Sequence, residues 1–417
     1  MAGLVTASRV NPTCGTLLMR NSGKPEFRCH PRLVSFLERK TWMPGTSPGM
    51  TTKIIFRARI NCMPDQWNKY AATAARKHGK PGREVRPKST TVDIHSHVAI
   101  PQAAAFVKPH LDMSTVPLAH FADTPAKALS QKQEEDVRAR ITGYDERLAD
   151  LDTMGIDLQL VMPPPNQCYY TVPLDIAVKV AQMLNDGLAQ YVARKADRFV
   201  ALGTVPLSDG AEAARELERC MTSLGMKGAE VLTNVAGREL SEPEYAPFWQ
   251  KAEALGALVV IHPNGFTEGR RLTRFYFNNV IGNPLETTIA LHYLIFDGVL
   301  ERHPKLKILA VHGGGYLPAY AGRIDHAWGA RSDAHGDLPR PPTSYLRQIY
   351  FDTVVFTPHQ LAELVRLYGA QRIIMGTDYP FDMAEYDPIG HLAAVEGLDP
   401  AAVAAIAGGN ARKLLGI

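Results

Sequence analysis

Eight short runs of apolar and β-branched residues recur between Val92 and Asp378, and longer segments with helical periodicity separate them. This alternation is typical of βα units that build a parallel sheet. Eight such units over roughly 325 residues predict an α/β fold, a (β/α)₈ barrel with loop insertions. A doubly wound sheet would more often carry a glycine-rich phosphate loop after its first strand, whereas this first strand ends in histidines. The expected strands are Val92–His95, Leu158–Met162, Phe199–Gly203, Gly228–Leu232, Leu258–His262, Ile308–His312, Ile349–Thr353 and Ile373–Asp378.

Helical segments lie between these strands, and several of them begin with Pro, Asp or Glu in the first turn. Two longer connections interrupt the alternation, Ala99–Ile141 after the first strand and Asn264–Gly282 after the fifth, and we expect both to be loop insertions. Long loops that follow barrel strands surround the active site, so these two are expected to be functional. The expected helices are Leu174–Lys195, Gly210–Leu224, Glu244–Leu255, Pro284–Leu300, Pro358–Tyr368 and Pro400–Leu415.

Residues 1–90 differ sharply in charge from the rest of the chain. They carry 17 Lys and Arg against 4 Asp and Glu, a net charge of +13, whereas residues 91–417 carry a net charge of −9. The segment is rich in Pro, Gly, Ser and Thr, and it lacks the apolar core of a secretory signal. We expect it to be disordered, or to represent translation upstream of the true start codon. A targeting segment and a basic interaction arm are the alternatives.

The composition also limits the class of protein. With 45% hydrophobic and 21% charged residues, the chain is typical of a soluble globular protein. No run of eighteen apolar residues exists, so we expect neither a membrane span nor a membrane partner. We expect no nucleic-acid partner either. The five cysteines are scattered and form no CxxC pair, which disfavours a disulfide scaffold and favours the reducing cytoplasm.

The first expected strand leads into the sequence His95-Ser96-His97. Residues i and i+2 of a strand lie on the same face, so both imidazoles are expected to point into the mouth of the barrel. Zinc binds neutral imidazole nitrogen at about 2.0–2.1 Å, and two such ligands can come from one strand end. An isolated pair of this kind is weak evidence, since core or turn histidines give the same pattern. Its position at the end of the first of eight strands favours a metal site.

Three further strands end in an ionisable side chain: the fifth at His262, the sixth at His312 and the eighth at Asp378. A buried histidine that is satisfied by hydrogen bonds would explain His262 or His312 taken singly. Four strands that end in His or Asp at the same face together favour a metal centre. His95, His97 and His262 are its expected imidazole ligands and Asp378 its carboxylate. One position stays open for water or substrate, as a catalytic site requires.

His312 is the expected base of this site. Zinc lowers the pKa of a bound water to about 7, and a neighbouring imidazole is a suitable proton acceptor at that pH. The glycines Gly313–Gly315 would let the backbone approach a ligand, and their amides could bind an anion; a tight strand-to-helix turn is the alternative. Lys227 begins the fourth strand rather than ending it, which disfavours a carbamylated lysine between two metals and favours a mononuclear site. The histidines expected to be solvated or structural are His292, His303, His326, His359 and His391.

Two arginines, Arg323 and Arg331, follow the sixth strand. A guanidinium group matches a carboxylate with two parallel hydrogen bonds, so both arginines are candidates for binding an acidic substrate. An ordinary surface ion pair is the alternative for each, and Asp325 is a competing partner nearby.

These motifs resemble the amidohydrolase superfamily, of the amidohydrolase 2 type, and within it the branch that contains aminocarboxymuconate-semialdehyde decarboxylase and related metal-dependent decarboxylases. The resemblance covers residues 91–417 and none of residues 1–90. The stretches that carry it are Asp93–His97, Arg147–Gln159, Ile261–Pro263, His312–Gly315, Arg323–Trp328 and Gly376–Phe381.

The resemblance implies the same four metal ligands and places His312 on the catalytic base. It places Arg323 on an arginine that holds the substrate carboxylate, and Arg331 on an arginine that the neighbouring subunit of a dimer contributes. A further substrate arginine of the family precedes Arg147, and Arg138 and Arg140 are the candidates for it. Where the decarboxylase continues with a tryptophan after the strand-five histidine, this chain has Asn264-Gly265-Phe266, which makes Phe266 a candidate substrate contact.

The sequence therefore predicts a cytoplasmic homodimeric carboxy-lyase that holds one divalent ion, zinc or else manganese. It would decarboxylate an unsaturated or aromatic acid without oxidation, as in the catabolism of aromatic compounds. His312 would act as base on metal-bound water, and Arg323 would hold the carboxylate. Hydrolysis or hydration of a lactone, amide or conjugated acid on the same scaffold is the alternative. A barrel that binds metal or an acidic ligand without turnover is a third hypothesis, which the presence of all four ligands and the base disfavours.

Overall fold

The computed structural model of the chain describes residues 82–417 and four two-residue strands further upstream. These strands pair antiparallel, β1 (Leu18–Met19) with β2 (Pro25–Glu26) and β3 (Leu37–Glu38) with β4 (Ile55–Phe56). Two compact units are present, residues 1–76 and residues 77–417. Most of the basic segment 1–90 thus lies outside the described residues. Within the second unit, the short helix α1 (Gly82–Val85) packs against the barrel helices α5 (Asp145–Met154) and α16 (Pro388–Ala393).

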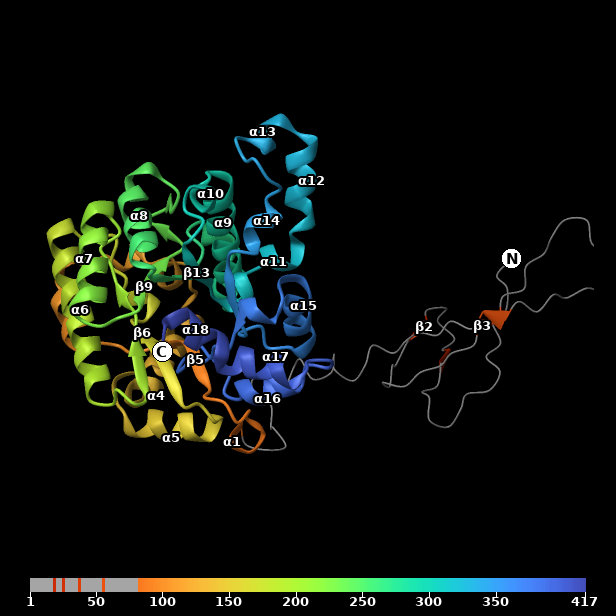
Figure 1. The fold of residues 1–417 in the computed structure, drawn as a ribbon, viewed down its shortest axis with the longest axis horizontal. Helices are drawn as coiled ribbons and strands as arrows, with labels where there is room; N and C mark the ends of the chain where they lie inside the picture. The colour runs from red at the N-terminus through yellow and green to blue at the C-terminus, as the bar shows by residue number, and fades with distance from the viewer. Residues whose placement is uncertain (1–17, 20–24, 27–36, 39–54, 57–81) are drawn as a thin grey trace, which may run out of the picture. The chain divides into compact units, whose positions relative to one another are not determined.

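The second unit is the expected barrel of parallel strands (Figure 1). One sheet runs in the order β5-β6-β7 and the other in the order β8-β9-β12-β13-β14-β15. β7 and β8 form one strand position that is interrupted at Leu202. The ring closes where Ile94 N donates to Met375 O (2.9 Å) and His97 N donates to Tyr379 O (2.8 Å). The strands are β5 (Val92–His97), β6 (Leu158–Met162), β7 (Phe199–Ala201), β8 (Gly203–Thr204), β9 (Gly228–Leu232), β12 (Leu258–His262), β13 (Lys307–Ala310), β14 (Tyr350–Asp352) and β15 (Ile373–Ile374).

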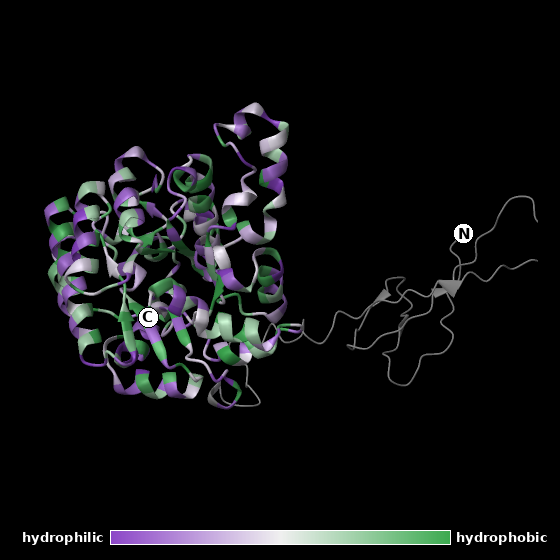
Figure 2. Ribbon diagram, viewed as in Figure 1, coloured by the Kyte–Doolittle hydropathy of each residue, from purple (hydrophilic) through white to green (hydrophobic). Residues whose placement is uncertain are grey.

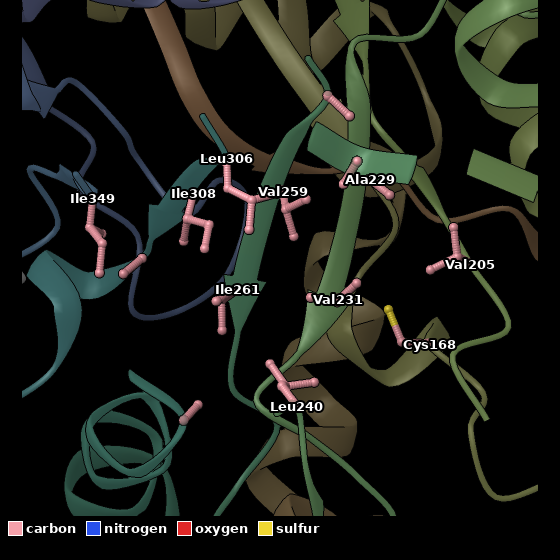
Figure 3. Close-up of a cluster of buried hydrophobic side chains, with 14 of the residues drawn as sticks. Cys168, Val205, Ala229, Val231, Leu240, Val259, Ile261, Leu306, Ile308 and Ile349 are labelled. Carbon is pink, nitrogen blue, oxygen red and sulfur yellow. The ribbon is translucent and has the colours of Figure 1, made fainter. Parts of the chain in front are cut away.

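Alternation along β12 separates the core into an inner and an outer layer. Leu258 and Val260 belong to an inner cluster that also contains side chains of β5, β6, β13 and β15, together with the C-terminal helix α18 (Asn410–Leu415). Val259 and Ile261 face the other way and pack in the outer cluster with residues of β9 (Figure 3). His262 continues the inner set, so its imidazole points into the barrel at the carboxyl end of the strand.

The outer layer consists of the expected helices, whose exposed faces are hydrophilic where the strands beneath them are hydrophobic (Figure 2). The predicted helix Pro284–Leu300 is divided at Gly298, which has a φ of 72°. The predicted helix Pro400–Leu415 contains a π-helical turn at Ala405–Gly409, where Gly408 packs directly on the backbone of Thr90. The helices are α6 (Leu174–Ala193), α7 (Gly210–Thr222), α8 (Ala246–Leu255), α9 (Asn283–Phe296), α10 (Val299–Arg302), α15 (Pro358–Tyr368), α17 (Pro400–Ala404) and α18.

The first insertion, Ala99–Ile141, is largely helical rather than a loop. It contains α2 (Pro101–Val107), α3 (Pro117–His120) and the long helix α4 (Thr124–Thr142). Asp123 caps α4 by accepting a hydrogen bond from Ala126 N at 3.0 Å. None of the residues of α4 is buried, so the helix has no apolar face and the sequence carries no periodic signal for it.

The two insertions dock onto each other at the mouth of the barrel. Leu118 N donates to Asn264 O at 3.2 Å, and the Asn278 side chain donates to Pro117 O at 2.8 Å. The second insertion is mostly irregular and ends in a π-helical turn at Asn278–Gly282. These contacts place both insertions beside the predicted metal ligand His262, which lies two residues before Asn264.

The connection between β13 and β14 forms a helical arm. It contains α11 (Leu317–Tyr320), α12 (Gly322–Ala330), α13 (Ser332–His335) and α14 (Thr343–Leu346), and α12 and α13 project furthest from the barrel (Figure 1). This arm carries Arg323 and Arg331. Across the described residues, none of the helices has the length and apolar character that crossing a membrane requires.

Candidate metal centre

Four side chains converge at the carboxyl ends of the strands. Ligand atoms of His95, His97, His262 and Asp378 all lie within 4.8 Å of one another, and all four residues are buried. The three imidazole rings form a triangle with centroids 5.1–5.2 Å apart and interplanar angles of 77–87°. The site residues expected from the strand ends are thus brought together.

The two histidines of β5 reach this position through an irregularity in the strand. Val92 and Ile94 belong to the inner cluster, so strict alternation would turn His95 and His97 outward. The register of β5 against β6 shifts between Asp93 and Ser96, as in a β-bulge. The extra residue re-aims the end of the strand, and both imidazoles face the mouth.

Each imidazole is oriented by a hydrogen bond at Nδ1. His95 Nδ1 lies 2.7 Å from Asp352 Oδ2, His97 Nδ1 lies 2.9 Å from Pro163 O, and His262 Nδ1 lies 2.7 Å from Pro263 O. An acceptor at Nδ1 fixes the proton on that nitrogen and leaves Nε2 with a free lone pair, as at metal-ligating histidines.

The donor set and its spacing fit a divalent ion. Asp378 Oδ1 lies 3.3, 3.1 and 3.9 Å from Nε2 of His95, His97 and His262. Ligands at about 2.0–2.1 Å from a tetrahedral zinc ion stand about 3.3 Å apart. Nε2 of His95 and of His262 are also buried without a hydrogen-bond partner, which is costly unless a cation takes their lone pairs. Three imidazoles and one carboxylate thus form a single divalent metal site.

The electrostatics of this cluster are strongly coupled. Burial opposes the protonation of His95, but the carboxylates of Asp378 and Asp352 outweigh it and raise its pKa to about 10. Burial lowers the pKa of His262 to about 3 and lowers that of His97 as well. Burial also works against the ionisation of Asp378, yet the charge of His95 and the surrounding imidazoles hold its pKa well below its usual range. Without a metal, His95 therefore tends to carry a second proton, on Nε2, whereas His97 and His262 stay neutral.

His312 faces the second oxygen of the same carboxylate. Its Nε2 lies 3.4 Å from Asp378 Oδ2, and its ring centroid lies 5.3 Å from that of His95 and 5.0 Å from that of His262. Asp378 thus presents Oδ1 to the three ligand imidazoles and Oδ2 to His312. His312 is also the most exposed of the four histidines, with 16% of its side chain accessible.

The predicted sixth and eighth strands end earlier than expected, at Ala310 and Ile374. Neither His312 nor Asp378 itself has strand geometry, because both adopt left-handed backbone conformations, with φ of 54° and 61°. The three glycines after His312 also have positive φ, and their amides are used within the protein: Gly313 N donates to Asp352 Oδ1 (2.9 Å), and the other two close the turn onto Val311 O and His312 O. The structure thus has the tight turn rather than free amides for an anion.

A buried polar network fastens β5 to the segment that carries Asp378. The carboxylate of Asp93 accepts four hydrogen bonds, from His95 N (3.0 Å), Thr377 N (3.0 Å), Thr377 Oγ1 (2.6 Å) and Gln159 Nε2 (2.8 Å). Burial raises the pKa of Asp93 to about 6, since these bonds only partly offset it. Arg147, also fully buried, donates to Gln159 Oε1 at 2.8 Å and to the backbone oxygens of His97 and Arg140.

Sequence reasoning missed Asp352 and the roles of Asp93, Gln159 and Arg147. Asp352 ends β14 in the same way that Asp378 follows β15, so the strand-end signal was available for it. Asp93, Gln159 and Arg147 lie inside the motifs that carry the family resemblance, but their partners are distant in sequence. Only the fold brings them together.

The arginines are not part of this cluster in a single chain. Arg323 is exposed on α12, and Arg331 pairs with Asp333 at 2.7 Å with 68% of its side chain accessible. Arg140 pairs with Asp150 at 2.9 Å, and Arg138 is exposed on α4. Among the described residues, none of the four makes an ion pair with a metal ligand.

Phe266 is half-buried in the second insertion, where its backbone nitrogen donates to Asn278 Oδ1 at 2.8 Å. The same insertion holds Phe275 and Tyr276 in left-handed conformations, with φ of 58° and 60°. The histidines expected to be structural lie outside the cluster, and of these His391 is fully buried and His303 pairs with Glu253 at 3.1 Å.

Comparison with known proteins places this site in a family. A family model described as amidohydrolase matches residues 92–417. The 2-amino-3-carboxymuconate-6-semialdehyde decarboxylase of Dictyostelium discoideum is 31% identical over 332 residues, which are 79% of this chain and 92% of that protein. The gamma-resorcylate decarboxylase of Rhodococcus jostii is 28% identical over 308 residues, which are 70% of this chain and 88% of that protein.

A solved structure gives the same result at the level of the fold. The 5-carboxyvanillate decarboxylase of Sphingomonas paucimobilis is 25% identical and superposes with a TM-score of 0.69, covering 79% of this chain and 99% of that chain. With a barrel, four convergent ligands and relatives matched over nearly their whole length, the chain belongs to the amidohydrolase family, in the group that contains these decarboxylases.

Proposed function

We propose that the protein is a mononuclear metal-dependent carboxy-lyase that removes carbon dioxide from an aromatic or unsaturated carboxylic acid. The observation that carries this proposal is the position of Asp378 between the ligands and His312. Its Oδ1 faces the three ligand imidazoles, and its Oδ2 faces His312. The decarboxylase names of the relatives support the reaction type. We propose zinc as the ion because three imidazoles and one carboxylate are its typical donors, with manganese as the alternative.

When bound, the divalent ion would supply Lewis acidity and orient the substrate's oxygen atoms. His312 would then handle the proton. Its Nε2 would accept a proton from water in the site and pass it to the carbon that bears the carboxylate. The bond between that carbon and the carboxylate breaks, its electron pair replaces the one taken up by the proton, and carbon dioxide leaves. The hydroxide that the water leaves behind takes up a proton from solvent. The sum is then the exchange of carbon dioxide for one proton, so no oxidant or organic cofactor is required.

We further propose that the arginines complete the site in a homodimer, with Arg323 holding the substrate carboxylate. Arg331 would reach the neighbouring subunit's site, and Arg138 is a further candidate on the exposed side of α4. The support is their exposure in one chain and the position of Arg323 and Arg331 on the projecting arm (Figure 1). A cytoplasmic location is proposed on the ground that Cys168 and Cys220 are buried free thiols.

The test combines metal analysis with product analysis on a panel of hydroxybenzoic and muconate-type acids. We expect about one zinc or manganese per chain and release of carbon dioxide with the ring or diene retained. His312→Gln should keep the metal and lose at least about a hundredfold in kcat, in the range for loss of a general acid or base. Ring opening or addition of water without carbon dioxide would assign the site to a hydrolase or hydratase instead. For the dimer, Arg331→Ala should lose activity, and mixing it with His312→Gln should restore part of that activity through hybrid dimers.

A further inference from the structure

A cleft of about 430 Å³ lies on the His262 side of the barrel mouth. Its walls are residues 111–121 of the first insertion and the loops 166–171, 232–237 and 264–268, which follow β6, β9 and β12. Leu232 is the register partner of His262 in the sheet, and Asn264 follows that ligand by two residues. The inner end of the cleft therefore adjoins the metal centre, although none of the four ligands nor His312 lines it.

The walls of the cleft are held in place by contacts between the segments. The hydroxyls of Thr115 and Thr171 lie 2.8 Å apart, which joins the first insertion to the loop after β6. The backbone of Leu118 is so close to Gly265 that a Cβ there would lie 2.4 Å from Leu118 N. Leu232 N donates to the hydroxyl of Tyr170 at 3.4 Å. Because these contacts link all four segments, the cleft is formed before any ligand binds.

The chemistry of the lining is neutral and aromatic. It includes Phe121, Tyr169 and Tyr170 together with side chains of Asn and Thr. It contains no Lys or Arg, and its ionisable side chains besides the tyrosines and Cys168 are the imidazole of His120 and the carboxylate of Glu268. A ligand carboxylate would therefore lose its hydration without meeting the permanent positive charge of a Lys or Arg, which is unfavourable. Tyr169 is only 8% exposed, and its hydroxyl has no hydrogen bond within the described part of the chain. Burial raises the pKa of Tyr169, so this hydroxyl stays protonated and can bond a neutral ligand oxygen.

We propose that this cleft is a substrate subsite for the uncharged, hydroxyl-bearing end of an aromatic acid whose carboxylate is held at the metal centre. The inference rests on the proposed function and narrows its substrate class. A cavity of about 150 Å³ holds one benzene ring, so a cleft of about 430 Å³ takes a second ring or a chain of similar size. The preferred substrate is thus an extended acid that is charged at one end only.

The experiment measures binding to the full chain loaded with Mn²⁺ by isothermal titration calorimetry. The probes are 4-hydroxybenzoate as the compact acid, the 3- and 4-carboxylates of 4′-hydroxybiphenyl as extended acids, and biphenyl-4,4′-dicarboxylate as an acid charged at both ends. At least one hydroxybiphenyl acid should bind ten times or more tightly than the compact acid. The dicarboxylate should bind at least ten times more weakly than the better hydroxybiphenyl acid.

Two variants test the location. The preference is the dissociation constant of the compact acid divided by that of the better hydroxybiphenyl acid. Ser114→Trp places a large ring in the cleft at an exposed serine and should reduce this preference at least tenfold. Ser223→Trp makes the same change at the exposed end of α7, on the opposite rim of the barrel, and should leave the preference as it is. Tyr169→Phe removes only the unpaired hydroxyl and should reduce the preference at least threefold.

The subsite would be overturned if the unaltered protein bound the compact and extended acids with affinities within twofold of each other. It would also be overturned if Ser114→Trp and Ser223→Trp changed the preference equally. The reaction type is judged separately, from carbon dioxide release. If no acid is decarboxylated but the hydroxybiphenyl acid still binds with an affinity that Ser114→Trp weakens, the proposed function fails and the subsite is retained.

Discussion

The orientation of Gln159 leads to a prediction that can be tested with a double-mutant cycle. Arg147 Nη1 donates to Gln159 Oε1 at 2.8 Å, which turns Nε2 of the same amide toward Asp93 at 2.8 Å. Asp93 must therefore be an acceptor on that side. In Asp93→Asn, an amide nitrogen replaces one acceptor oxygen. In one orientation it faces Nε2 of Gln159, and in the other it faces the backbone nitrogens of His95 and Thr377. Turning the Gln159 amide over does not help, because its Nε2 would then face Arg147. At least one buried donor is left unpaired.

The cost follows from the contacts that are lost. A buried donor without a partner costs about 1–3 kcal/mol, and a hydrogen bond to a charged acceptor is worth about 1.5–3 kcal/mol. We expect Asp93→Asn to lower the free energy of unfolding by about 2–4 kcal/mol. Gln159→Glu alone sets two carboxylates side by side and should cost about 1–3 kcal/mol, since Arg147 offsets part of the repulsion.

The double variant Asp93→Asn/Gln159→Glu exchanges the amide and the carboxylate. The carboxylate introduced at position 159 can accept from both Arg147 and the new amide at position 93, and the Thr377 hydroxyl can turn to His95 O, which already lies 3.3 Å away. We expect the double variant to be more stable than the sum of the two single effects by at least about 1.5 kcal/mol. Urea unfolding of the metal-loaded proteins, followed by tryptophan fluorescence, measures all four corners. Additive single effects would refute the argument that Arg147 fixes the orientation of Gln159.

Three further outcomes are expected. The carboxylates of Asp378 and Asp352 raise the pKa of His95 to about 10 without metal, so binding of Zn²⁺ to the apoprotein at pH 6.0–6.5 should displace one proton per site. Calorimetry in buffers of different ionisation enthalpy measures the number of protons released. No net release would contradict a protonated His95. Asp352→Asn should weaken metal affinity about 10–100-fold in chelator competition, whereas Asp186→Asn, an exposed aspartate paired with Arg219, should not change it. Burial and neighbouring carboxylates raise the pKa of Glu239 to about 7, so the folded protein binds the Glu239 proton more tightly than the unfolded chain does. This effect stabilises the fold at low pH and is lost as the pH rises through 7. Glu239→Gln should therefore raise the melting temperature more at pH 8 than at pH 5.5, and Glu218→Gln is the matched control. An equal rise in melting temperature at the two pH values would contradict the raised pKa of Glu239.

The sequence predicts the frame of the barrel well, because its strands are buried on both faces and are bounded by turns. β6, β9 and β12 have the predicted bounds, and α15 agrees to the residue. The helix α4 could not be predicted, since it lies at the mouth with no buried face and so lacks the apolar period by which helices are recognised. Helices of this kind are stabilised by their caps and their docking, which depend on residues elsewhere in the chain.

The candidate site shows the same limit. A strand-end rule identifies Asp378, but the rule applies equally to Asp352, which contacts His95 Nδ1 rather than the ligand side of the ring. The identity of a ligand therefore depends on which nitrogen of a histidine a carboxylate faces, and a sequence pattern does not contain that information. The arginines are limited in another way. Arg331 lies on an arm that projects from its own barrel, so one chain cannot define what it binds.

Only one of the five central side chains reaches the metal centre by regular strand alternation. His262 continues the inner set of Leu258 and Val260, whereas His95 and His97 depend on the register shift in β5. His312 follows Val311 of the inner cluster, so alternation would turn it outward, and its left-handed backbone brings it back toward the ligands. Asp378 is also left-handed, and such conformations cost about 1–3 kcal/mol each in residues other than glycine. Hydrogen bonds from Asp378 N to His95 O and from Gly313 N to Asp352 offset this cost, so the residues that position the ligands also hold the backbone in the conformation that the chemistry requires.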